Sequence, residues 1–252
     1  MSRIPNSKFL ILPVPLNRAL SKLGILSRAQ ATAAIRAGRV RVDGRIVTDP
    51  AHAVMPERVR IAIDGAAHVC AAWRTILFHK PRGIVTTRRD PEGRRTVFDV
   101  IGEESRGLNA VGRLDLATSG LLLLTTDTQF ANWITDPANA VSRVYAVTVR
   151  GRVTGAELAA LRADVTMRKV STRESHLLVE LRSGRNREVR RLFEGIGHEV
   201  TRLKRVRFGG LELESLEPGR WRDLTRDEIR AAFPAAPISG RGRLPSTASA
   251  GR

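Results

Sequence analysis

The sequence predicts an α+β protein, with a small N-terminal helix-helix-hairpin domain followed by a larger domain on a mixed or antiparallel sheet. Two observations carry this prediction. Near the start of the chain, helical periodicity over residues 16–38 changes to an alternating pattern at Val40 and Val42. From Thr75 onward, short strand-like runs interleave with two helical stretches. This second segment, of about 160 residues, is long enough to bury one sizeable core.

The first domain is expected over residues 16–65 and begins with a short helix that Gly24 ends. Four apolar residues form the inward face of that helix: Leu16, Ala19, Leu20 and Leu23. Ser27 is a suitable N-cap for a second helix, which Gly38 ends, and Asp43-Gly44 predicts a hairpin turn. A unit of this size is too small for a deep active site, which favours a docking role. Its basic residues are Arg18, Lys22, Arg28, Arg36, Arg39 and Arg41.

The larger domain is expected over residues 75–235, after a linker at 66–74. Its predicted strands cover residues 76–78, 121–125, 144–149 and 177–181. One helix is predicted over residues 130–134. A second follows Asn186, because Val189, Leu192, Phe193 and Ile196 recur at helical spacing with Gly197 beyond. Residues 1–15 are an N-terminal extension, and residues 236–252, rich in Pro, Gly, Ser, Ala and Arg, are expected to be a flexible basic tail.

The charge of the chain indicates a polyanionic partner. There are 43 Lys and Arg residues against 25 Asp and Glu, which gives a net charge of +18. Residues 16–65 carry about +5 and residues 66–235 about +8, so the excess is not confined to a tail. A surface of this kind attracts nucleic acid over long distances. Charge that serves only solubility remains the alternative.

Several classes of protein lose support. The single cysteine excludes a disulfide framework and a multi-cysteine zinc site, and no two histidines have the spacing of a helical metal site. No nucleotide-binding glycine motif is present, so we expect neither metal nor cofactor. No apolar run is long enough to cross a bilayer, which favours a cytoplasmic protein without membrane contact.

Asp115 is the residue at which chemistry is expected. It lies in the segment GRLDLATSG, directly before the apolar run 121–124, so a carboxylate stands where a polar turn meets a buried strand. The alternative is a structural turn in which the aspartate bonds its own backbone.

The segment LNRALSKLGILSRAQATAAIRAGRVRVDGRIV resembles the S-four RNA-binding domain, which many RNA-modifying enzymes carry. The resemblance covers about fifty residues and includes the order of the elements as well as the charge. It implies that this part of the chain binds structured RNA.

Four further segments resemble the RsuA/RluB/RluE/RluF family of ribosomal RNA pseudouridine synthases. They are KPRGIVTT, GRLDLATSGLLLLTTD, RVYAVTV and GRNREVRRLFEGIGHEVTRLKRVRFG. The segments RRDPEGRRTVFDVI and GRNREVRRLFE most resemble the RluB type, which acts on large-subunit RNA. The resemblance implies the pseudouridine synthase fold, no cofactor, and isomerisation of uridine within ribosomal RNA or a partly assembled subunit. We expect a monomer.

The same resemblance implies roles for individual residues. Asp115 would attack the substrate or remove a sugar proton, and the two remain open; either requires the ionised form, which a cation at Arg190 would support. Tyr145 would stack on the uracil, although its strand pattern alone indicates a core residue, and Leu203 would form the floor of the pocket. Arg113 would enter the stack that the uridine vacates or contact phosphate. Phosphate contact or a structural role is expected for Lys80, Arg185, Arg187 and Arg205.

The sequence thus predicts a two-domain RNA pseudouridine synthase. A catalytically silent RNA-binding or ribosome-assembly factor with the same fold is the alternative.

Overall fold

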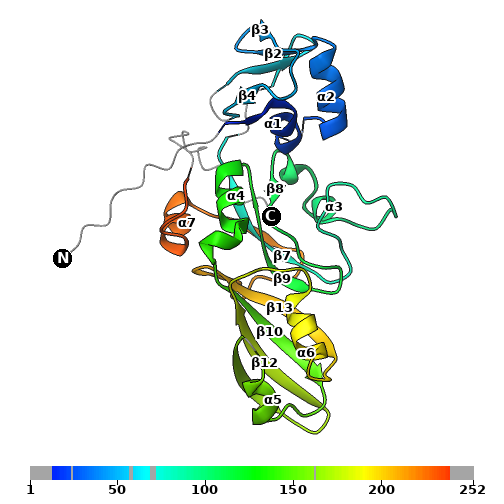
Figure 1. Ribbon diagram of the computed structural model, residues 1–252, viewed down its shortest axis with the longest axis vertical. Coiled ribbons are helices and arrows are strands. Elements are labelled where there is room, and N and C mark those ends of the chain that lie inside the picture. Colours follow the sequence, from blue (N-terminus) through cyan, green and yellow to red (C-terminus); the bar gives the residue numbers. More distant parts are fainter. Residues whose placement is uncertain (1–12, 24, 57–58, 69–71, 162, 239–252) are drawn as a thin grey trace, which may run out of the picture.

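The computed structural model describes residues 13–23, 25–56, 59–68, 72–161 and 163–238. Figure 1 shows an elongated molecule, with the N-terminal elements at one end and the strands of a long sheet extending to the other. None of the helices within the described residues is long and apolar enough to cross a membrane.

The N-terminal elements follow the predicted order. Helices α1 (Leu16–Lys22) and α2 (Arg28–Arg36) precede strands β2 (Val40–Val42) and β3 (Arg45–Ile46). These strands join β5 (Ile61–Ile63) and β6 (Ala66–His68) in the order β3-β2-β5-β6, and β1 (Val14–Pro15) pairs with β4 (Ala53–Val54).

The local signals of this region act as expected. Leu16, Ala19 and Leu20 are fully buried. Ser27 caps α2 in a capping box, since its side chain accepts from the Gln30 N–H and its own N–H donates to the Gln30 side chain. Asp43 and Gly44 both have positive φ, 48° and 83°, as a tight hairpin turn requires. Gly24, expected to end α1, lies outside the described residues.

The larger part is built on a mixed nine-stranded sheet. Its main path is β11-β12-β10-β13-β9-β7-β15, with β14 beside β13 and β8 beside β9. The strands are β7 (Thr75–Lys80), β8 (Asn109–Ala110), β9 (Ser119–Thr125), β10 (Arg143–Arg150), β11 (Asp164–Val170), β12 (Glu174–Leu181), β13 (Val200–Phe208), β14 (Leu211–Glu212) and β15 (Trp221–Asp223). All pairings are antiparallel except that of β9 with β13.

The four predicted strands correspond to β7, β9, β10 and β12, and the two predicted helices to α4 (Thr128–Thr135) and α6 (Glu188–Glu194). Sequence reasoning missed several elements of the sheet and its connections. The missed helices are α3 (Val97–Ile101), α5 (Gly155–Ala159) and α7 (Arg226–Ala232), with the short 3₁₀ turns η1 (Gly102–Ser105) and η2 (Pro137–Asn139). Ala236 and Ile238 pack against the core, so the packed chain continues into the expected tail, whose residues 239–252 lie outside the described part.

Three apolar clusters divide the larger part into two halves that meet where β9 pairs with β13. Two clusters cover β7 and β9, and the third packs α6 against β10, β12 and β13. Gly120 permits this junction: its φ is +111°, and a Cβ there would lie 2.2 Å from the Arg205 carbonyl oxygen. The strand that follows Asp115 is thus held directly against the strand that carries Arg205.

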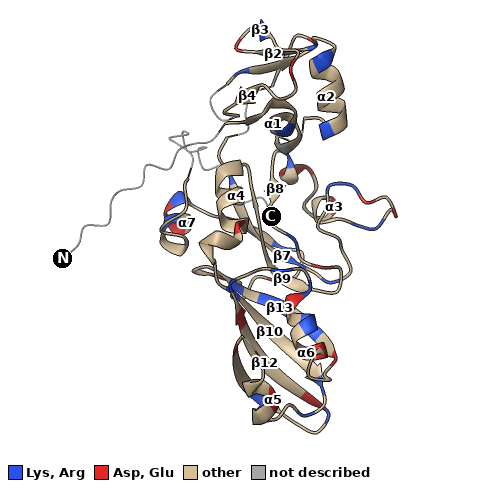
Figure 2. Ribbon diagram, viewed as in Figure 1, with Lys and Arg blue, Asp and Glu red and all other residues tan. Residues whose placement is uncertain are grey.

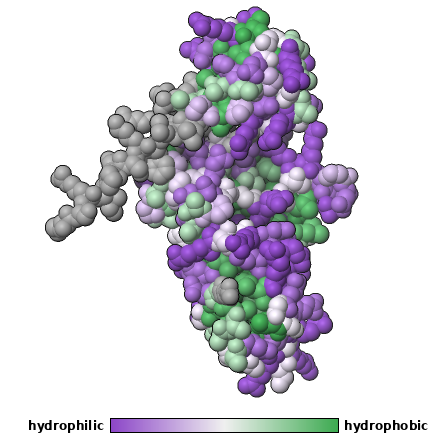
Figure 3. Space-filling view, in the orientation of Figure 1, coloured by the Kyte–Doolittle hydropathy of each residue, from purple (hydrophilic) through white to green (hydrophobic). Residues whose placement is uncertain are grey.

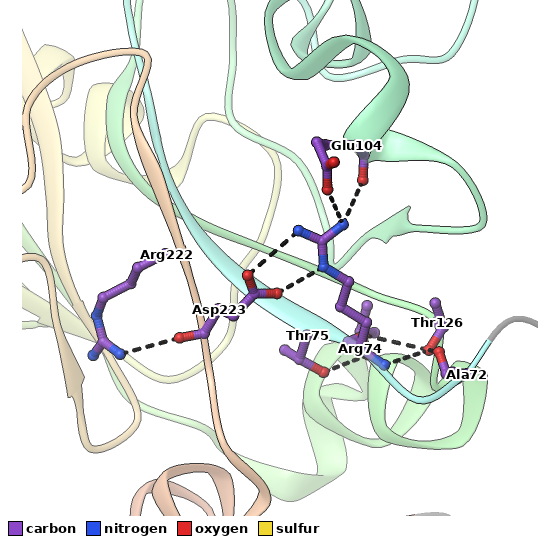
Figure 4. Close-up of polar contacts among 8 residues, drawn as sticks. Ala72, Arg74, Thr75, Glu104, Thr126, Arg222 and Asp223 are labelled. Carbon is purple, nitrogen blue, oxygen red and sulfur yellow. Dashed lines mark hydrogen bonds and ion pairs between the residues drawn. The ribbon is translucent and has the colours of Figure 1, made fainter. Parts of the chain in front are cut away.

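Arg74, at the start of β7, ties the outer edge of this sheet to its connections (Figure 4). Its guanidinium donates to Asp223 Oδ1 at 2.7 Å and to Glu104 Oε2 at 2.7 Å, and its N–H donates to Thr126 Oγ1 at 2.9 Å. The side chain and backbone of one residue therefore link β15, η1 and the turn after β9.

Candidate active site

A pocket of about 280 Å³ opens where the two halves of the sheet meet. The loop before β9, strands β10 and β13, and the turn before α6 contribute to its walls. The predicted residues that line it are Arg113, Asp115, Tyr145, Arg185, Arg187, Leu203 and Arg205. Segments about 90 residues apart in the chain thus converge on one cavity, as expected of a functional site.

Asp115 lies in a loop that is hydrogen-bonded along its whole length. Its carbonyl accepts from the Thr118 N–H at 2.9 Å, which closes a turn with Leu116 and Ala117 at the tip. The carbonyls of Leu114 and Leu116 accept from the Thr86 hydroxyl at 2.9 Å and the Gly83 N–H at 2.8 Å. The segment after β7 therefore supports the aspartate loop, and the partly exposed Asp115 side chain lines the pocket.

Lys80 anchors the same loop from beneath. This side chain is completely buried, and its Nζ donates to the carbonyls of Pro81 at 3.1 Å, Asp115 at 3.1 Å and Thr118 at 2.9 Å. Burial lowers the pKa of Lys80 from 10.5 to about 8, while attraction to Asp115 opposes that change. Lys80 does not reach the pocket, so the structure corrects the expectation that it contacts substrate and leaves it the structural role.

Arg190 is buried beside the loop, at 9% exposure, and is not a solvated surface residue. Its Nη1 donates to the Val200 carbonyl at 2.9 Å and its Nη2 to the Ala117 carbonyl at 3.4 Å. Desolvation lowers the Arg190 pKa, and attraction to Asp115 partly offsets this. No ion pair within 4.0 Å joins Arg190 to Asp115 in the described part of the chain. The guanidinium was expected to bind the Asp115 carboxylate. It instead bonds the carbonyl of Ala117, two residues further along the chain.

Tyr145 and Arg205 face each other across β10 and β13, and Val147 pairs with Leu203 in the same register. Tyr145 is partly exposed and packs against apolar clusters of both halves of the sheet. Leu203 is 5% exposed and Arg205 only 3%. Both line the pocket, as the floor position predicted for Leu203 requires.

Arg205 is therefore a floor residue and is too deep to meet a phosphate at the surface. Its Nε donates to the Leu121 carbonyl at 2.7 Å, and its guanidinium lies 4.6 Å from the Phe208 ring centroid. Burial lowers its pKa, and the Tyr145 hydroxyl partly offsets this. Arg185 and Arg187 are exposed at the rim, where phosphate contact is sterically open.

Arg143 is a pocket residue that sequence reasoning missed. It is 6% exposed, donates to the carbonyls of Val141 at 2.7 Å and Ile134 at 3.1 Å, and lies 5.0 Å from the Phe208 centroid. Two guanidinium groups thus contact one ring. Gly184 (φ +65°) lies so close that an added Cβ would be 3.1 Å from the Arg143 Cζ. The available signal was a basic residue that opens the strand of Tyr145.

The predicted docking residues Arg18, Arg28, Arg36, Arg39 and Arg41 are all exposed, whereas the Lys22 side chain lies outside the described part. Arg39 is paired with Asp64, with Nε 2.8 Å from Oδ1. Figure 2 shows basic residues on α1 and α2 and again on α6, and in Figure 3 hydrophilic residues are spread along the whole length of the visible face. Within the described residues, no cluster of His, Cys, Asp and Glu is suited to a metal ion.

Comparison with known proteins agrees with this architecture. Residues 74–195 match the family model described as RNA pseudouridylate synthase, and residues 14–59 match the S4 domain. The fold and pocket define the class as an RNA-modifying enzyme with an appended RNA-binding module. The chain belongs to the RNA pseudouridylate synthase family, whose members isomerise uridine in RNA.

Individual relatives cover most of the chain. Ribosomal large subunit pseudouridine synthase B of Salmonella typhi is 40% identical over 232 residues, and the match covers 83% of this chain and 78% of that protein. The protein of the same name from Vibrio cholerae is 39% identical over 241 residues, 85% of this chain and 72% of the relative. A crystal structure of a pseudouridylate synthase matches with a TM-score of 0.59 and 29% identity, covering 86% of this chain and 98% of that one.

Proposed function

We propose that this enzyme converts a uridine of large-subunit ribosomal RNA into pseudouridine, with Asp115 as the reacting carboxylate. The observation that carries the proposal is the position of Asp115, in a pocket with Tyr145 and Leu203, on a loop held by Lys80 and Arg190. The choice of large-subunit RNA rests on the relatives, which are named large subunit pseudouridine synthases.

The reaction breaks the bond between N1 of uracil and C1′ of the ribose, turns the base, and joins C1′ to C5. The C5 proton leaves, and N1 gains a proton, so the product is an isomer of the substrate and no redox partner is needed. Asp115 acts through its ionised oxygen, either by attack at C1′ or by removal of a sugar proton. Capture of the intermediate with a 5-fluorouridine RNA, followed by identification of the linked or eliminated species, distinguishes the two.

Other residues hold the base and the RNA in place. Tyr145 stacks on the uracil, a contact worth about 1–3 kcal/mol per base, and its hydroxyl handles the C5 proton. Leu203 supports the base from below. Arg113, Arg185 and Arg187, all exposed at the pocket, bind the phosphates on either side of the extruded nucleotide. Their exposure and charge suit contacts to phosphate, for which charge matters more than exact placement.

The N-terminal part supplies affinity. Its exposed arginines form a basic surface, which suits docking on folded RNA. The substrate is thus ribosomal RNA or a partly assembled subunit, met in the cytoplasm by a monomeric enzyme.

Tritium release tests the proposal. Wild-type protein incubated with ribosomal RNA labelled at uridine C5 should release tritium, and Asp115→Asn should release none while it binds the RNA with unchanged affinity. Mapping of pseudouridines in ribosomal RNA from cells with and without the gene then locates the target. If the wild type releases no tritium from free RNA or from ribosomal subunits, the catalytically silent alternative replaces this proposal.

A further inference from the structure

Leu116, the residue after Asp115, exposes a large apolar side chain at the rim of the active site. It is 41% exposed, and within the described residues only Ile46 and Val170 are large apolar residues of comparable exposure. It occupies the tip of a turn, a position that usually takes Gly, Pro, Asn or Asp. Leu114, two residues earlier, is buried at 5% exposure. The exposed apolar surface is therefore confined to the tip of the turn, where Ala117 is also exposed, and does not extend back to Leu114.

The exposure of Leu116 does not result from a loose loop. Every carbonyl from Leu114 to Thr118 accepts a hydrogen bond, with donors from the Thr86 hydroxyl, the Lys80 ammonium, the Gly83 N–H and the Arg190 guanidinium. The Leu116 carbonyl itself is bound by the Gly83 N–H at 2.8 Å. Because these bonds hold the backbone, the turn cannot change shape to bury Leu116 without breaking them.

The location of Leu116 separates it from the pocket that takes the base. Asp115 and Thr118 line the pocket, and so does Arg113, whereas Leu116 does not. A uridine that enters the pocket leaves a gap between the bases that flanked it, and unstacking at that gap has a free-energy cost. Apolar side chains are used elsewhere to fill such gaps between base steps.

We propose that Leu116 packs against a base that flanks the target uridine and fills the vacated position in the stack, so that it stabilises the extruded state. This proposal rests on the proposed function, since it requires that an RNA uridine enter the pocket beside Asp115. It assigns the stack-filling role to Leu116, and it leaves Arg113, which lines the pocket, to bind phosphate. The hydrogen-bonded turn fits this role, because a side chain that holds two bases apart needs a backbone that stays in place.

Single-turnover kinetics on two RNAs test the role of Leu116. The first is a stem-loop transcript that holds the mapped target uridine within a stacked helix, and the second is an unstructured strand with the same flanking bases. Leu116→Ala should slow tritium release about tenfold or more on the stem-loop, equal to about 1.4 kcal/mol of barrier, and less than about twofold on the strand. Leu116→Met should restore the rate, because it returns apolar bulk. Val170→Ala, which removes a side chain of matched exposure on β11, should change neither rate.

A fluorescent base beside the target gives a second readout. In stem-loop RNA with 2-aminopurine next to the uridine, the bound Asp115→Asn protein should raise the emission of 2-aminopurine. The reason is that Leu116, in the gap, prevents this base from stacking on the base on the other side. The double variant with Leu116→Ala should leave emission low. Equal slowing on both RNAs, unchanged rates on both, or a stem-loop-specific loss found only in Arg113→Ala would overturn the proposal. Failure of wild-type protein to convert either RNA would instead show that the proposed function is wrong.

Discussion

Replacement of the buried Lys80 should destabilise the aspartate loop in a way that depends on pH. Lys80→Met keeps the aliphatic bulk and removes the ammonium that bonds the carbonyls of Pro81, Asp115 and Thr118. An unpaired buried carbonyl costs about 1–3 kcal/mol. All three carbonyls lose this donor in the variant, and the Asp115 carbonyl keeps the Thr118 N–H. Because loss of a buried charge offsets part of the cost, we expect a net loss of about 2 kcal/mol at pH 7.

The sign of the pH dependence follows from the pKa of Lys80. Burial lowers that pKa from 10.5 to about 8 in the folded state. Between pH 8 and 10.5 the unfolded chain therefore binds more protons than the folded chain, so the wild-type free energy of unfolding rises with pH in this window. The contribution amounts to about 2 kcal/mol between pH 7.5 and 9.5. Lys80→Met lacks it, so the difference in stability between the two proteins should widen by that amount.

Urea unfolding followed by tryptophan fluorescence measures this difference. The chain has three tryptophans: Trp133 and Trp221 lie in the larger part and Trp73 packs against its core, so the signal reports the part that contains Lys80. Lys169→Met, which changes an exposed lysine on β11, serves as control and should differ little from wild type at either pH. A stability difference between wild type and Lys80→Met that stays constant from pH 7.5 to 9.5 would refute the account of Lys80 as a buried ammonium.

Three further predictions concern the junction of β9 with β13, the guanidinium of Arg190 and the binding of RNA by the basic surface. Gly120→Ala should lower the melting temperature sharply or prevent folding in scanning calorimetry, because its Cβ would meet the Arg205 carbonyl at 2.2 Å; an unchanged melting temperature would contradict this packing. Arg190→Ala should reduce kcat by about tenfold or more while RNA affinity in filter binding stays within about twofold, and comparable losses in both would argue against a role in the loop. The logarithm of RNA affinity should fall steeply and linearly with the logarithm of salt concentration, and a flat dependence would show that the basic surface does not bind phosphate.

The sequence predicts the strands whose apolar pattern is continuous. It does not predict strands in which charged residues interrupt that pattern. The run 121–124 in β9 and the alternation in β10 and β12 are unambiguous. Strand β13 was missed because basic residues interrupt its pattern, although one of them, Arg205, is buried as deeply as an apolar residue. Strand β11 was missed because it is an edge strand with mostly exposed side chains.

The missed short helices did have a local signal. Each of α3, α5 and α7 begins with a threonine that forms a capping box with an acidic residue three positions later. Those threonines are Thr96, Thr154 and Thr225. A search for Thr-x-x-Asp/Glu would have located the starts of these helices, since each capping pair satisfies two N–H groups at the helix start. Their few apolar positions left the periodicity too weak to detect.

Much of the candidate site came from the resemblance, and its geometry could not be read from the sequence. Residue types fix which side chains carry charge, but they do not determine whether an arginine bonds a carboxylate or a peptide carbonyl. Arg190 was expected to pair with the Asp115 carboxylate and instead bonds the carbonyls of Val200 and Ala117. The difference arises because the turn before β9 and the first residue of β13 present the carbonyls of Ala117 and Val200 to the guanidinium.

That difference has a chemical consequence for Asp115. Four buried cations around the pocket donate hydrogen bonds to backbone carbonyls, namely Lys80, Arg143, Arg190 and Arg205. Within the described residues no ion pair occupies the Asp115 carboxylate, yet Lys80 and Arg190 both attract it electrostatically. A carboxylate locked in a bidentate pair would have to break two charge-assisted bonds before it could react. Because Lys80 and Arg190 bond the carbonyls of the loop rather than the acid, they do not tie up the Asp115 oxygens, as the proposed reaction with a nucleoside requires.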